Sequence, residues 1–209
     1  MGGLDQLGSG TRSPEKFEKN IIVEIGSGAN PFILEVSQDY RDRFKNEPET
    51  HYFALDINEP ELRRGKSLQE QASAAIGLKN VKEKIHYLKA SGEMLPFPDA
   101  SVSEIIMSNV LGDPGAPFSG KMSMVEEITR VLKEDGTLKI VEYYTPWVAD
   151  GAIEKVRTYL EEIDSKKEGL PTQEKNSDAE LAQKAKRIFG DDKQIFVRRF
   201  RKKPPTTEL

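Results

Sequence analysis

The sequence predicts a doubly wound α/β fold, with a mainly parallel sheet and helices on both faces. One observation is the β-branched run at residues 20–25, which ends at Gly26 and Gly28 and is followed by an amphipathic segment. This order is typical of a strand, a tight turn and a helix. A second observation is that strand-like and helix-like segments alternate to about residue 144, which favours right-handed crossovers between parallel strands.

Each further element follows from its local pattern of apolar and polar residues. The glycines after the first strand allow a sharp turn and let the backbone approach a ligand closely. Strands are expected at residues 20–25, 51–56, 84–89, 102–108, 137–143 and 193–202. Helices are expected at residues 32–45, 60–77, 121–132, 150–164 and 178–189.

Length and composition indicate one globular domain. In the chain of 209 residues, we expect a polar lead-in at 1–19 that could form part of a lid, a single domain at 20–203 and a disordered tail at 204–209. No apolar run reaches the roughly 18 residues of a membrane span, so no contact with membranes is expected. The chain has no cysteine, which excludes disulfides and thiolate metal sites. A cytoplasmic protein is therefore the default expectation.

The first predicted turn has the features of a nucleotide-binding site. Glu24 is unusual for a phosphate cradle, because its carboxylate would repel a pyrophosphate, but it suits a ligand that carries an amine or a cation. Asp56 ends the second strand, where this fold places a carboxylate that accepts hydrogen bonds from ribose hydroxyls. Pro31 occupies the position of the third glycine in the G-x-G-x-x-G fingerprint, which disfavours a nicotinamide-dependent oxidoreductase.

Four motifs then follow one another in register. They are E-I-G-S-G-A-N at the first turn, F-A-L-D-I-N at the end of the second strand, G-E-M-L-P-F-P-D-A-S-V after the third, and E-I-T-R-V-L-K-E-D-G-T-L before the fifth. Over roughly residues 20–145, the chain resembles the class I S-adenosylmethionine-dependent methyltransferases. The resemblance implies a Rossmann-like methyltransferase fold of six or seven strands, with the last strand antiparallel. No sixth strand is evident between residues 150 and 192, so a reduced sheet is an alternative.

The resemblance also implies a cofactor, S-adenosyl-L-methionine, and the residues that would bind it. Gly26 and Gly28 would bring the backbone against the methionine part, and Glu24 would attract its ammonium group. Asp56 would hold the ribose hydroxyls, with Ile57 against the adenine face. The expected adenine contact is weakened at Ser91, where many relatives have an acid. The complete predicted set is Glu24, Gly26, Ser27, Gly28, Asn30, Asp56, Ile57, Ser91, Gly92, Glu93, Ser108, Asn109 and Val110.

The acceptor side is predicted from the loops that follow the fourth and fifth strands. In the Gly- and Pro-rich loop at 112–120, Asp113 is more simply a turn residue than a general base. Neither histidine is expected near the methyl group, so no catalytic base is identified and catalysis by proximity is expected. No carboxylates or histidines have metal-ligand spacing, so no metal is predicted. The predicted substrate-binding residues are Asp113, Phe118, Tyr143, Tyr144 and Trp147.

The methyl acceptor stays open at the level of sequence. The C-terminal segment 184–209 has nine Lys or Arg and three acids, in a chain of net charge −4. This segment is either a charge-protected edge strand with a tail or a patch for RNA. Few residues are expected to cover the site, because only about 19 residues precede the first strand. Such a thin cover fits either an open site for a large acceptor or a lid that orders on a small molecule. We favour the small molecule, with O- or N-methylation undecided. The alternatives are an RNA or protein methyltransferase, or a non-catalytic module that binds the cofactor.

Overall fold

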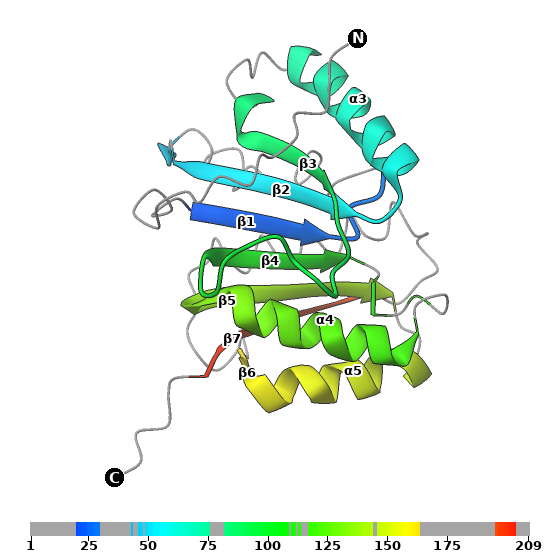
Figure 1. Ribbon diagram of the computed structural model, residues 1–209, viewed down its shortest axis with the longest axis vertical. Helices are drawn as coiled ribbons and strands as arrows, with labels where there is room; N and C mark the ends of the chain where they lie inside the picture. Colours follow the sequence, from blue (N-terminus) through cyan, green and yellow to red (C-terminus); the bar gives the residue numbers. More distant parts are fainter. Residues whose placement is uncertain are drawn as a thin grey trace.

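The computed structural model describes residues 20–29, 43, 46–47, 49–75, 82–108, 110–111, 113, 117–143, 146–163 and 195–203. A seven-stranded sheet in the order β3-β2-β1-β4-β5-β7-β6 forms its centre (Figure 1). Among the described helices, none is long and apolar enough to cross a membrane.

The sheet is parallel from β3 to β5. The strands are β1 (Asn20–Ile25), β2 (Thr50–Asp56), β3 (Ile85–Lys89), β4 (Val102–Ser108), β5 (Leu132–Tyr143), β6 (Leu160–Glu162) and β7 (Ile195–Lys202). β7 pairs antiparallel with β5, and β6 pairs antiparallel with β7. Because β2 and β4 flank β1 on opposite sides, the chain changes direction there, which is the point where doubly wound sheets bind ligands. The predicted fold class, including its antiparallel last strand, is confirmed.

Helices cover the two faces of this sheet. They are α3 (Glu59–Ala75), α4 (Phe118–Val131) and α5 (Pro146–Tyr159), with a short 3-10 turn, η2 (Lys82–Lys84). α4 and α5 lie side by side against the β4–β7 half (Figure 1). α4 buries Val125, Ile128 and Val131 against an apolar cluster that includes Ile105 and Leu138, so this face is held by the burial of apolar surface.

The largest differences from the predicted boundaries concern β6 and β5, and α4 and α5 also begin three to four residues earlier than predicted. Residues 160–162, expected as the end of a helix, form β6 and complete the seven strands. Pairing with β7 decides this, since Leu160 is buried and Glu161 and Glu162 form ion pairs with arginines of β7. A three-residue strand is too short to show the alternation of a strand in sequence. β5 also starts earlier than expected, at Leu132, which pairs with Val102.

Several predicted segments lie outside the described residues. These are the lead-in at 1–19, the tail at 204–209, the helix at 178–189 and all of the helix at 32–45 except Arg43.

Candidate active site

The turn after β1 is fastened to the end of β2. The amide nitrogens of Gly26 and Ser27 both donate to the carbonyl oxygen of Leu55, at 2.9 and 3.0 Å. Gly26 (φ +76°) and Gly28 (φ +53°) take the left-handed backbone conformation that glycine adopts without steric cost. A Cβ on Gly26 would lie 2.3 Å from Cγ2 of Val110, whereas a Cβ on Gly28 would meet no atom of the described residues within 4 Å. The turn is therefore closed by the loop after β4 at Gly26 and open at Gly28.

Asp56 connects this turn to the start of α3. Its Oδ2 accepts a hydrogen bond from the amide of Gly28 at 2.8 Å, and its Oδ1 accepts one from the amide of Asn58, also at 2.8 Å. A carboxylate has about four acceptor sites, so both oxygens keep capacity for hydroxyl donors. The next side chain, Ile57, is 71% exposed. An oriented carboxylate beside an exposed aliphatic side chain is suited to a ribose and the flat face of a base.

Ser27 supplies an independent test of whether a polar ligand fits here. Its side chain is only 4% exposed. Among the described residues, its Oγ and Nε2 of Gln69 are the buried side-chain polar atoms that lack a hydrogen-bond partner. Leaving a hydroxyl buried and unpaired costs about 1–3 kcal/mol. A ligand with a polar group at the turn would satisfy this hydroxyl, so the residues present fit the methionine part of the predicted cofactor.

Glu24 lies directly before the turn and is fully buried. Its Oε2 accepts a short hydrogen bond from the hydroxyl of Tyr52 on β2. Burial, and secondarily the charge of Glu24, raises the pKa of Tyr87 on β3 above its ordinary value, so this neighbour stays neutral. Because the Glu24 carboxylate has no exposed surface, it would act on a bound cation through its electric field and not by direct contact.

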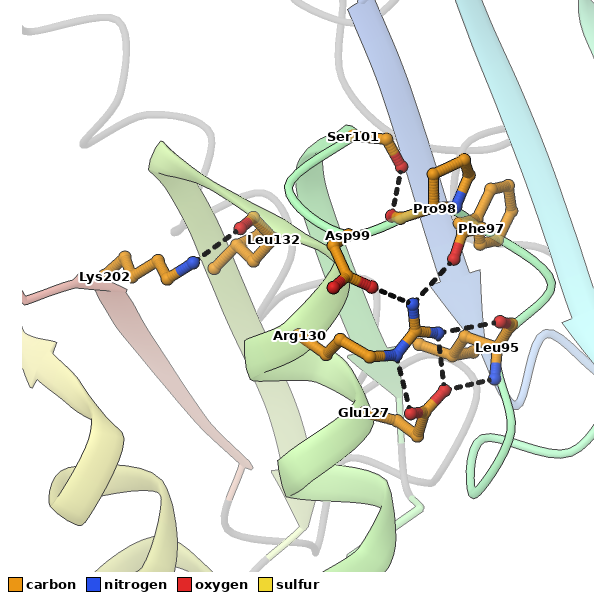
Figure 2. A network of polar contacts seen from close by, with 9 residues as sticks. All are labelled: Leu95, Phe97, Pro98, Asp99, Ser101, Glu127, Arg130, Leu132 and Lys202. Atoms are coloured by element: carbon orange, nitrogen blue, oxygen red, sulfur yellow. Dashed lines mark hydrogen bonds and ion pairs between the residues drawn. The ribbon is translucent and has the colours of Figure 1, made fainter. Parts of the chain in front are cut away.

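The loop after β3 is clamped to α4 by Arg130, at the centre of the network in Figure 2. Its Nη2 donates to the carbonyl oxygen of Leu95 at 3.1 Å, and its Nη1 donates to the carbonyl oxygen of Phe97 at 3.0 Å and to Asp99 at 2.7 Å. Glu127 accepts two hydrogen bonds of 2.8 Å from Arg130 and one of 2.9 Å from the amide of Leu95. The hydrogen bond to Arg130 lowers the pKa of Glu127. This clamp was not predicted from sequence, where its only signal is the i, i+3 spacing of Glu127 and Arg130 on a helix.

The three predicted residues at the start of this loop share one turn. The Oγ of Ser91 accepts a hydrogen bond from the amide of Glu93 at 3.2 Å, so its acceptor capacity is partly used inside the turn. A Cβ on Gly92 would lie 2.8 Å from the Cε of Met124, which shows that Gly92 packs closely on α4. A Cβ on Gly120 would lie 2.6 Å from Oε1 of Glu93, so this carboxylate lies against the first turn of α4.

The remaining predicted cofactor residues end β4 or lie beyond the description. Ser108 is the buried last residue of β4, and Val110 contacts the glycine turn as described above. Asn30 and Asn109 lie outside the described residues. The structure thus brings the described members of the predicted set to the carboxyl ends of β1, β2, β3 and β4.

On the acceptor side, a buried lysine fixes the loop after β4. Lys121 of α4 is only 1% exposed, and its Nζ donates to the carbonyl oxygen of Asp113 at 2.6 Å. Phe118, at the start of α4, is 57% exposed, and a Cβ on Gly151 of α5 would lie 3.1 Å from its ring. Sequence alone gave no signal for Lys121, since a lysine on a helix is ordinarily solvated. Tyr144 and the side chains of Tyr143 and Trp147 lie outside the description.

The two histidines form a pair away from the turn. The Nδ1 of His51 lies 3.0 Å from the Nε2 of His86, and the rings stack. His51 lies near the start of β2, whereas Asp56 is its last residue. In the part of the chain that the structure describes, no group of three or more histidines and carboxylates could hold a metal ion.

Three of the four basic residues of β7 pair with acids. Arg198 pairs with Glu162 at 2.9 Å and Arg201 with Glu161 at 3.3 Å. Lys202 pairs with Glu134 at 3.0 Å. β7 is not the edge strand that the sequence predicted, because it pairs with β5 on one side and, through residues 200–202, with β6 on the other. These three cations are engaged with acids on neighbouring elements.

Comparisons with known proteins agree with the motifs. Residues 23–140 match a family model described as a methyltransferase domain. The uncharacterized methyltransferase YcgJ of Bacillus subtilis strain 168 is 36% identical over 142 residues, which cover 68% of this chain and 48% of that protein. This chain therefore spans about half the length of that curated relative.

Solved structures of low sequence identity share the fold. A chain in the complex of the Haloferax volcanii Trm112 methyltransferase activator has a TM-score of 0.55 at 16% identity, covering 90% of this chain and 84% of that one. The aminoglycoside resistance methyltransferase NpmB1 has a TM-score of 0.53 at 17% identity, covering 90% and 91%. The [4+2]-cyclase SpnF has a TM-score of 0.53 at 14% identity, covering 88% and 75%. These likenesses show the fold alone, and a cyclase among them illustrates that function must be argued from the site.

Proposed function

Because this chain belongs to the methyltransferase domain family, we propose that it transfers a methyl group from S-adenosyl-L-methionine to an oxygen or nitrogen of a small molecule. The observation that carries the cofactor is the turn after β1. It combines a buried, unpaired Ser27 hydroxyl, a carboxylate at Asp56 with spare acceptor capacity, and an open side at Gly28.

Each group of the turn has a role that follows from its chemistry. Asp56 accepts hydrogen bonds from the ribose hydroxyls, and Ile57 covers one face of the adenine. Ser27 bonds a polar group of the methionine part. When bound, the cofactor supplies a methyl group on a sulfonium, which a nucleophile displaces. The protein contributes orientation, which by itself accounts for about 7–11 kcal/mol of barrier lowering in well-aligned reactions.

Two observations support a small acceptor. Three cations of β7 that would attract RNA, Arg198, Arg201 and Lys202, are engaged with acids. At the start of α4, Phe118 exposes an aromatic ring. The loop before it is held by the hydrogen bond from Lys121 to the carbonyl oxygen of Asp113. An exposed ring next to the site suits an apolar or aromatic portion of a small molecule better than a phosphate backbone.

The cofactor is tested by calorimetric titration with S-adenosylhomocysteine. We expect binding by the native protein, and about a tenfold or greater loss in Asp56→Ala, since hydrogen bonds to a charged group contribute about 1.5–3 kcal/mol. Arg201→Ala is the matched control, because its carboxylate partner is exposed and remote from the turn. Absence of binding by the native protein would refute the cofactor assignment.

The acceptor is tested with methyl-labelled cofactor and separate RNA, protein and small-metabolite fractions. We expect label in the metabolite fraction, unchanged in a variant with Arg198, Arg199 and Arg201 replaced by Ala. Label in RNA that disappears in this variant would establish the alternative acceptor. Cofactor that binds but transfers no methyl to any fraction would establish the non-catalytic module.

A further inference from the structure

The hydrogen bond between Tyr52 and Glu24 joins two side chains that are both fully buried. They lie on the same face of the sheet, on adjacent strands, because Glu24 pairs in register with Ala54, two residues from Tyr52. Glu24 is two residues before Gly26, so the pair lies directly beneath the turn that we assign to the methionine part of the cofactor.

A buried carboxylate is retained in a protein only where its environment compensates for the loss of water. A hydroxyl donor to one oxygen favours the ionised form and fixes the orientation of the carboxylate. Charged and polar groups on the neighbouring strands have contacts of their own. On β4, Glu104 is engaged with Arg43 and Lys139, and on β3 the hydroxyl of Tyr87 lies 3.5 Å from a carbonyl of α3, that of Gly65.

We propose that Tyr52 is a positioning residue for the cofactor, holding the Glu24 carboxylate beneath the glycine turn so that it favours a ligand with an α-ammonium group. This inference rests on the proposed cofactor and adds to it a residue that acts only through another. Tyr52 itself has no exposed surface and cannot touch the ligand in this conformation.

The inference predicts a selectivity that a merely structural tyrosine would not alter. Two probes separate the effects: S-adenosylhomocysteine, and its desamino analogue, in which hydrogen replaces the ammonium group. Calorimetry on the full chain gives the ratio of the two dissociation constants. A general loss of fold or of turn geometry weakens both ligands and leaves this ratio unchanged, whereas loss of the Glu24 field weakens only the ammonium-bearing ligand.

The variants are Tyr52→Phe, Glu24→Gln and the two combined. Tyr159→Phe is the matched control, because Tyr159 packs against the apolar cluster on the opposite face. We expect the native protein and Tyr159→Phe to prefer S-adenosylhomocysteine by about tenfold, the effect of a carboxylate that attracts the ammonium group at short range without touching it. Tyr52→Phe should reduce this preference to about threefold or less. Glu24→Gln should abolish it, and adding Tyr52→Phe to Glu24→Gln should change it no further.

Three results would overturn the inference. A Tyr52→Phe ratio equal to the native one, with a collapsed ratio in Glu24→Gln, would leave Tyr52 a structural role only. A ratio in the combined variant that differs from the ratio in Glu24→Gln would show that Tyr52 does not act through Glu24. Equal affinity of the native protein for the two ligands would remove the role of Glu24, while failure to bind either ligand would instead refute the proposed cofactor. If Tyr52→Phe alone does not fold, the combined variant, in which the buried charge is removed together with the hydroxyl, still allows the ratio to be measured against Glu24→Gln.

Discussion

β4 presents Ile105 and Met107 to the face of the sheet that α4 and α5 cover, and Glu104 to the opposite face. β5 repeats the contrast, with Leu138 in the apolar cluster and Lys139 on the opposite face, where its Nζ lies 2.8 Å from Oε1 of Glu104. Both faces are buried here, but one is held by apolar contacts and the other includes paired charges. The comparison teaches that an alternating pattern in these strands does not mark a solvated face.

The face with paired charges tolerates smaller displacements of its side chains than the apolar face. Glu104 also binds Arg43 at 2.7 Å, so one carboxylate serves two cations. Apolar side chains tolerate small shifts, whereas a buried ion that loses its partner is left with an uncompensated desolvation penalty. Glu24, which lies next to the candidate site, is on the same face of the sheet as Glu104. The residues proposed to act on the cofactor and the buried ion pairs therefore lie on one side of the sheet.

The largest expected effect comes from removing the shared carboxylate. Glu104→Leu leaves Arg43 and Lys139 without this partner, and we expect a loss of about 5 kcal/mol in the free energy of unfolding. Lys139→Met should cost less, about 3 kcal/mol, because Arg43 stays available to Glu104. Urea denaturation of the three proteins measures both values. Equal losses in the two variants would show that Glu104 is not the centre of the network.

A large truncation on the apolar face sharpens the comparison. Ile128→Ala removes a fully buried side chain of α4 and should lower the free energy of unfolding by about 3 kcal/mol, through lost burial and the cavity left behind. It should leave the dissociation constant for S-adenosylhomocysteine within about twofold, since no polar group of the turn is touched. A much weaker affinity in a protein that is still folded at the assay temperature would mean that the apolar face also positions the site.

Sequence predicted the parts of this molecule that local patterns determine. The buried run at residues 20–25 and the glycines after it defined β1 and the turn, because φ above zero requires glycine there. The end of the second strand at Asp56 was predicted correctly, whereas the role of Asp56 toward a ribose stays a prediction. The motifs also led to the correct family, because their order along the chain is specific.

The parts that sequence did not predict depend on contacts between distant residues. Tyr52 reads as an ordinary strand residue, and only the register of β1 and β2 places its hydroxyl on Glu24. Lys121 and Arg130 read as solvated helix positions, yet both hold loops through backbone carbonyls. β6 escaped prediction because its three residues are ordered by pairing with β7, far along the chain.

A smaller effect on stability is expected at the glycine turn after β1. Gly26→Ala and Gly28→Ala are matched, since both place alanine in the left-handed conformation, at about 1–2 kcal/mol each. Only the Gly26 variant adds a clash, because its Cβ would meet Val110, which packs against the apolar cluster. We therefore expect Gly26→Ala to have the lower melting temperature, measured by thermal unfolding. Equal melting temperatures would show that Val110 moves aside freely and does not close the turn.

The smallest effect concerns the loss of stability at low pH that is due to the Glu127–Arg130 clamp on α4. The pKa of Glu127 is lowered in the folded protein, chiefly by its hydrogen bond to Arg130. A carboxyl group with a lowered folded pKa stabilises the fold above its unfolded pKa of about 4.3, and this contribution is lost as the pH falls through the lower, folded value. In urea titrations from pH 6 to pH 3, the native protein should lose stability more steeply below about pH 4.5 than Glu127→Gln, which cannot ionise. Glu126→Gln is the control, since Glu126 of the same helix pairs with Lys155 of α5 and its side chain is more exposed than that of Glu127. A native slope matched by Glu127→Gln would mean that the clamp in Figure 2 does not depend on the charge of Glu127, and that the neutral amide holds Arg130 and the loop equally well.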